Sequence, residues 1–139
     1  MTIDWHAKYS LSSNGGDWTG QVSSVTVTNT MQPALSWVVP GKGTTSVLSH
    51  EQTHFDLNEV YRRKLEAVLP CLQARHATKQ GVIDALNAAI HRRANEILAQ
   101  LEAAQARYDA ETRHGQSASA QARWESQIAG WLSNPTAAP

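Results

Sequence analysis

The sequence predicts an α+β fold in which a small N-terminal β-sheet is followed by three helices. Before about residue 45 the chain is rich in Gly, Ser, Thr and Trp, and it carries alternating valines. After that point apolar residues recur every three or four positions, which is the period of an amphipathic helix. With 139 residues the chain is expected to form a single domain over residues 1–132, followed by a flexible tail over residues 133–139.

The N-terminal segment carries the signals of a sheet. Residues 21–30 alternate Val22, Val25 and Val27 with Ser and Thr, as half-exposed strands do. Residues 14–17, Asn-Gly-Gly-Asp, predict a turn between two short strands, since glycine tolerates positive φ. Residues 36–39 read as a further strand, closed by Pro40 and Gly41.

Three helices are expected after the sheet. The first begins at Thr44 or Thr45, which can cap it, and stops at Pro70. Its inward stripe consists of His50, His54, Leu57, Tyr61, Leu65 and Val68. The second helix covers residues 82–113, with Gly115 placed to terminate it. The third covers residues 117–130 and offers Trp124 to the core.

Composition excludes several classes of function. The chain has 12 basic and 12 acidic residues, so its charge gives no reason to expect nucleic acid or an anionic membrane as partner. Cys71 is the single cysteine, which rules out an internal disulfide and predicts a small core residue. No apolar run approaches the length of a membrane span, and residues 1–10 lack the pattern of a signal peptide.

One motif indicates metal chemistry. His50, Glu51 and His54 form H-E-x-x-H within the first predicted helix. Residues four apart lie on one helix face, so both imidazoles can bind one metal ion while Glu51 reaches a water activated by it. Nitrogen ligands of this kind favour Zn²⁺, although another divalent ion can occupy such a site. His76 and His91 have arginine neighbours and are expected on solvated helix surface.

A catalytic zinc site needs a third protein ligand. The candidates lie on or near the end of the second helix, and they are Glu102, Asp109, Glu111 and His114. Helical spacing from the buried stripe at Tyr108 favours Glu111 over Asp109. His114 stands beside Gly115, where the helix is expected to end and the backbone is free. Spacing alone does not choose among them.

Two separated blocks of sequence resemble a known family. Residues 50–57 read H-E-Q-T-H-F-D-L, and residues 108–115 read Y-D-A-E-T-R-H-G, with Gln121 and Trp124 following. Together with S-W-V at residues 36–38, they are similar to a bacterial family of proposed zinc-dependent proteases, described as a domain of unknown function. The resemblance covers most of residues 37–131 and implies a zincin-like metallopeptidase fold.

The resemblance also implies roles for individual residues. His50, His54 and His114 would be the zinc ligands, with Glu111 as the alternative third ligand, and Glu51 would be the general base. Asp109 would orient a ligand imidazole, and Tyr108 would hydrogen-bond an oxyanion. The substrate would be a peptide or protein, and residues 36–39 are the expected strand that pairs with its backbone.

A non-enzymatic reading competes with the peptidase. In that reading the zinc only ties the first helix to the end of the second, and the domain is a binding or accessory module. Glu51 favours the enzyme, because a purely structural site needs no base beside its first ligand. The sequence leaves open the oligomeric state, the substrate, and the location, which is periplasmic or secreted by resemblance and cytoplasmic if no export signal exists.

Overall fold

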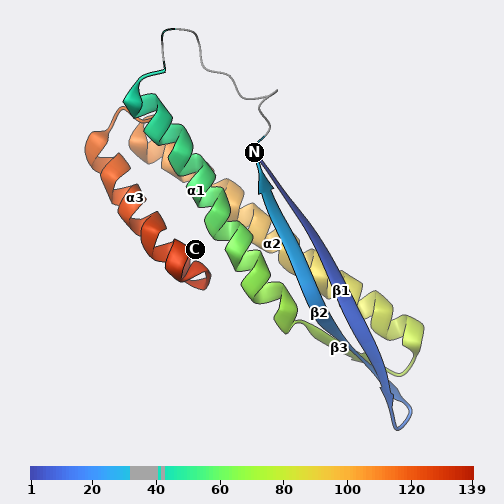
Figure 1. Ribbon diagram of the computed structural model, residues 1–139. Helices are drawn as coiled ribbons and strands as arrows, with labels where there is room; N and C mark the ends of the chain where they lie inside the picture. Colours follow the sequence, from blue (N-terminus) through green and yellow to red (C-terminus); the bar gives the residue numbers. More distant parts are fainter. Residues whose placement is uncertain (32–40, 42) are drawn as a thin grey trace.

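A computed structural model of the chain describes residues 1–31, 41 and 43–139. It shows a three-stranded antiparallel sheet in the order β1-β2-β3, and three helices (Figure 1). The predicted α+β class is therefore confirmed. The strand expected at residues 36–39, together with Trp37, lies outside the described residues.

A long hairpin forms most of the sheet. Strand β1 (Thr2–Asn14) pairs with β2 (Asp17–Thr30), and the predicted turn at residues 14–17 joins them. Gly15 and Gly16 have φ values of 62° and 101°, the left-handed conformations that a two-residue hairpin turn requires. The strands are 13 and 14 residues long, so the expectation of short strands was wrong.

A register shift explains the irregular spacing of the valines in β2. Lys8 pairs with Ser24 but Tyr9 pairs with Val22, so Ser23 is an extra residue in β2. A bulge of this kind moves the following residues to the other face. Val22 and Val25 are three positions apart and yet both face inward, with Val22 buried and Val25 half-buried.

The third strand was not anticipated. Strand β3 (Gln73–His76) is only four residues long and pairs antiparallel with residues 18–21 of β2. His76 therefore lies in a strand, so its expected place on a helix was wrong. Cys71 is exposed, contrary to the expectation of a core position, because its neighbour Leu69 fills the core instead. Both residues belong to a short 3₁₀ helix, η2 (Leu69–Cys71), which contains Pro70.

Helix α1 (Thr45–Val68) lies between the hairpin and α3 and also contacts α2 (Figure 1). Its start is capped as expected, because the Thr44 hydroxyl accepts a hydrogen bond from the backbone N–H of Val47. The buried side chains include His50, and among the apolar residues Leu57, Val60, Tyr61 and Leu65 are fully enclosed. The inward stripe predicted for this helix is thus largely confirmed.

Helix α2 (Lys79–Thr112) is capped by Thr78, begins before the predicted start at Val82, and ends next to the predicted end at Arg113. Arg113, His114 and Gly115 all have positive φ, and this left-handed turn reverses the chain. Helix α3 (Ala118–Ser133) then runs back along α1, with Ser117 as its cap. Trp124 is 1% exposed, which confirms its predicted core position.

The last residues lie against α1 rather than apart from the domain. A 3₁₀ turn, η3 (Pro135–Ala137), follows α3, and Ala138 is buried. The Lys64 ammonium donates to the backbone oxygen of Ala138 at 2.7 Å, and the Tyr61 hydroxyl donates to that of Pro139 at 2.5 Å. The residues expected to form a flexible tail thus make specific contacts. None of the described helices is long and apolar enough to cross a membrane.

The sheet is held to α2 by a small apolar cluster that Leu86 anchors. Leu86 is fully buried and packs with Val22 and Ile90. We expect Leu86→Ala to lower the free energy of unfolding by about 2–5 kcal/mol, because it removes buried methyl groups and leaves a cavity. Urea unfolding followed by circular dichroism measures this loss. Leu48→Ala is the control, since Leu48 is 56% exposed and its truncation should change stability by less than about 0.5 kcal/mol. Equal losses would contradict the packing described.

Candidate metal centre

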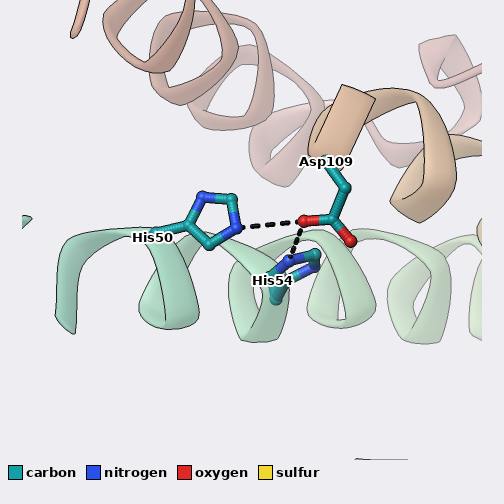
Figure 2. A group of neighbouring side chains, drawn as sticks. All are labelled: His50, His54 and Asp109. Carbon is teal, nitrogen blue, oxygen red and sulfur yellow. Dashed lines mark hydrogen bonds and ion pairs between the residues drawn. The ribbon is translucent and has the colours of Figure 1, made fainter. Parts of the chain in front are cut away.

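Two histidines of α1 and one aspartate of α2 meet at a single point. His50 and His54 are one helical turn apart and face the last turns of α2 (Figure 2). The Nε2 atom of His50 lies 3.0 Å from Oδ1 of Asp109, and Nε2 of His54 lies 2.8 Å from the same oxygen. The three possible ligand atoms lie within 4.8 Å of one another. Among the described residues this is the group with the composition of a metal site.

The other nitrogen of each ring faces a glutamine. Nδ1 of His54 contacts Oε1 of Gln105, and Nδ1 of His50 lies 3.4 Å from Oε1 of Gln121. Gln105 belongs to α2 and Gln121 to α3, so each imidazole is held between the cluster and an amide from a different element.

Hydrogen bonds to neighbouring acceptors fix both amide groups. The Gln105 amide nitrogen donates to the backbone oxygen of His54 at 3.0 Å and to Oδ1 of Asn58 at 2.8 Å. The Gln121 amide nitrogen donates to Oγ1 of Thr53 at 3.0 Å and to a carboxylate oxygen of Glu125 at 2.9 Å. With the nitrogens so engaged, the amide oxygens must be the atoms that face the imidazoles.

This arrangement assigns the tautomer of each histidine. An amide oxygen only accepts hydrogen bonds, so Nδ1 of each ring carries the proton and Nε2 presents its lone pair. Asp109 contributes a further acceptor oxygen. Three electron-rich atoms then face one point, and either added protons or a cation must relieve their repulsion. Two imidazole nitrogens and a carboxylate oxygen are a donor set that zinc accepts, so the residues present fit a divalent metal.

The ionisation state of Asp109 agrees with a ligand role. Burial by itself raises the pKa of this carboxyl group. When the histidines are protonated also on Nε2, the charge of His54 and the hydrogen bonds that both rings donate outweigh it and leave the pKa below its ordinary value. The carboxylate is therefore ionised at neutral pH, as a metal ligand must be.

Tyr108 lies behind the histidines, inside the core. Its ring stacks on that of His50 with 4.7 Å between centroids, and it meets His54 edge to face at the same distance. The hydroxyl donates to Oε1 of Gln121 at 2.7 Å and lies 3.2 Å from the backbone oxygen of His50. Burial raises the pKa of this phenol, which keeps it a donor. In this position Tyr108 supports His50 and Gln121 from the core side.

The remaining predicted site residues lie at different distances from the cluster. Glu51 is on the exposed face of α1, one residue after His50. The His114 side chain is 78% exposed, and its Nδ1 atom lies 3.6 Å from Oδ1 of Asp109. Glu111 points elsewhere, because it accepts a hydrogen bond from the Trp124 indole at 2.8 Å and pairs with Arg107 at 3.2 Å. The structure thus brings Asp109 to the histidines, leaves His114 beside it, and does not bring Glu111.

Sequence reasoning missed Gln105 and gave Gln121 no role of its own. The signal for Gln105 was its position four residues before Asp109, which puts both side chains on one face of α2. The signal for Gln121 was its place in the family resemblance, but its contact with His50 was not readable, since only the reversal of the chain after Thr112 brings α3 alongside α1.

A pocket of about 650 Å³ adjoins the cluster. Its walls come from the start of α1, the turn after α2, and α3, and they include His114, Gly115 and Gln121. His50, His54 and Asp109 do not line it, so it borders the candidate metal centre without containing it. Glu125 and Ser49, joined by a 2.9 Å hydrogen bond, add polar groups to its wall.

Comparison with known proteins gives a family but no activity. The family described as "Bacterial protein of unknown function (DUF922)" matches residues 1–115. The chain belongs to this family. No curated protein and no solved structure matches the chain. The DUF922 match includes His50, Glu51, His54, Asp109 and His114, and it stops before α3, which carries Gln121.

Gly115 allows the turn after α2 to lie against the cluster. A Cβ atom at this position would lie 3.1 Å from Cβ and 3.3 Å from Nδ1 of His50, and the φ of Gly115 is 85°. We expect Gly115→Ala to cost at least about 1–2 kcal/mol of folding free energy and to displace His50, which would weaken metal binding. Gly130→Ala is the matched control, since it lies within α3 with no atom within 4 Å of the added methyl group.

The control substitution should stabilise the protein by about 0.5–1 kcal/mol, because alanine is the better helix former. Urea unfolding and zinc affinity are measured on both variants. If Gly115→Ala behaved like Gly130→Ala, the close approach of this turn to His50 would be wrong.

Proposed function

We propose that this DUF922 protein is a zinc-dependent peptidase. The observation that carries the proposal is the convergence of both Nε2 atoms and Oδ1 of Asp109, with each Nδ1 facing a glutamine oxygen. An H-E-x-x-H helix that presents its histidines in this way has the parts of a zincin-like active site. The zincin-like fold is part of the same proposal.

We propose Asp109 as the third ligand in place of His114. Its oxygen already faces both histidines within 3.0 Å. His114 is mostly exposed and lies nearest to Asp109 itself, so it is the alternative ligand or a donor to the Asp109 carboxylate. Glu111 is occupied by Trp124 and Arg107 and is left out.

Individual residues of the chain have separate roles in the proposed peptide hydrolysis. A zinc ion, when bound, lowers the pKa of a water molecule toward about 7 and polarises the substrate carbonyl. Glu51, exposed beside His50, accepts the proton from the attacking water and transfers it to the leaving amine. Gln105, Gln121 and Tyr108 keep the imidazoles in place. The adjoining pocket offers room for substrate side chains next to His114.

A structural zinc site is the second candidate. The observation that favours it is that His50 and His54 of α1 meet Asp109 in the last turns of α2, so that a bound metal would cross-link two long helices and stabilise the fold. Metal binding tests whether the site exists, and Glu51 separates the two candidates.

The first test is the zinc content of freshly purified protein, measured by elemental mass spectrometry without added metal. We expect close to one zinc per chain, and loss of that zinc in His50→Ala and His54→Ala. Asp109→Ala should lower the zinc content strongly, while Glu111→Ala should leave it unchanged and serves as the control. If His114→Ala removed the metal and Asp109→Ala did not, the choice of third ligand would be wrong. A folded protein that takes up no zinc would contradict the proposal.

The second test separates catalysis from a structural site. We expect Glu51→Gln to retain zinc and lose about 10²- to 10⁴-fold in turnover of an unstructured fluorogenic peptide library, because it removes the proton acceptor. Glu102→Gln, an exposed substitution on α2, is the control and should keep full activity. A wild-type protein that holds zinc but cleaves no peptide would favour the structural site.

A further inference from the structure

We propose that Gln105 and Gln121 are positioning residues that set the metal-binding tautomer of both histidines. This inference rests on the proposed function, since it concerns the same metal centre. Each amide oxygen receives the Nδ1 proton of one ring, and each ring thereby presents its Nε2 lone pair to the point shared with Asp109. A hydrogen bond from the second ring nitrogen commonly orients a metal-bound histidine.

The amides are held so that they cannot reverse without loss. Turning over Gln105 would place its NH₂ group against Nδ1 of His54 and remove two donated hydrogen bonds, to His54 and to Asn58. Turning over Gln121 would likewise remove its bonds to Thr53 and Glu125. Thr53 reinforces this orientation, because its hydroxyl donates to the backbone oxygen of Ser49 at 2.8 Å and is left as an acceptor. In the described part of the chain, no buried side-chain N or O atom lacks a partner.

The two glutamines differ in how firmly they hold their rings. Gln105 presents its oxygen to Nδ1 of His54. Gln121 stands 3.4 Å from Nδ1 of His50, and its oxygen also accepts a hydrogen bond from the Tyr108 hydroxyl. Because the bond from His50 to Gln121 is long and its acceptor is shared, the loss of Gln121 should cost less metal affinity than the loss of Gln105. This order is a specific consequence of the geometry.

Gln121 also makes α3 part of the metal centre. It lies beyond residues 1–115, the region matched by the family, yet it touches His50, Thr53 and Tyr108. The candidate metal centre therefore contains side chains from α1, α2 and α3.

The test compares zinc affinity in methionine variants of the full chain. Methionine has the length of glutamine but offers no amide oxygen, so Gln105→Met and Gln121→Met remove the acceptor while largely keeping the volume. We expect zinc affinity, measured by competition with a chelator, to fall about 10- to 100-fold, with the larger loss in Gln105→Met. Gln127→Met, an exposed substitution on α3, should bind zinc as the wild type does. Far-UV circular dichroism establishes that each variant is folded.

A conservative variant distinguishes positioning from simple packing. Gln105→Glu retains an acceptor oxygen for Nδ1 of His54 but gives up the donation to the backbone oxygen of His54, while Asn58 can rotate its amide to donate to the second oxygen. We expect this variant to recover part of the zinc affinity that Gln105→Met loses. In cobalt-substituted protein, the visible absorption bands of Gln105→Glu should match those of the wild type, while those of Gln105→Met should shift.

Nitrogen NMR of the zinc-loaded wild-type protein tests the tautomers without any substitution. Both rings should carry their proton on Nδ1, with Nε2 metal-bound. Protons on Nε2 in either ring, or methionine variants that bind zinc with wild-type affinity, would overturn this inference and leave the peptidase proposal standing. A wild-type protein that binds no zinc would overturn both. Zinc-loaded wild type that shows the expected tautomers but cleaves no peptide would keep this inference and remove only the catalytic proposal.

Discussion

The approach of α1 to the last turns of α2 is the constraint on which the rest of the site depends. It brings one carboxylate oxygen of Asp109 within 3.0 Å of two imidazoles that the H-E-x-x-H spacing has already placed on one face of α1. The packing that enforces this approach is apolar, with Leu57, Tyr61 and Tyr108 among the buried side chains. Because the carboxylate and both nitrogens offer lone pairs, the apolar packing holds together polar atoms that repel one another in the absence of a cation or added protons.

The reversal of the chain after α2 supplies the second half of the site. Arg113, His114 and Gly115 all adopt left-handed backbone conformations, and this turn sends α3 back along α1. It lets Gly115 lie directly against His50, and it brings Gln121 to Nδ1 of the same ring. Gln121 is itself held by Tyr108, Thr53 and Glu125, and this polar network fixes the orientation of the His50 imidazole.

Much of the fold was readable from the sequence, and the exceptions have physical causes. The hairpin turn at residues 14–17 and the cap at Thr44 are local events, decided by the residues themselves. Strand β3 was missed because four residues are too few to show the alternation of a strand. Its pairing with β2 depends on how the rest of the chain folds, since the two segments are far apart in the sequence. The bulge at Ser23 could not be predicted either, because it is defined by how β1 and β2 pair and not by either strand alone.

By itself the sequence determined the class of the fold and the pair of histidines, since spacing along a helix fixes which side chains share a face. It narrowed the third metal ligand to four candidate residues. It could not choose among them, because three of the candidates, Asp109, Glu111 and His114, lie within two helical turns of one another. Only the tertiary structure decided that Asp109 faces the histidines, that Glu111 turns toward Trp124, and that two glutamines stand behind the rings. Which residues share a helix face follows from the local chain, whereas which faces meet follows from the packing of the whole domain.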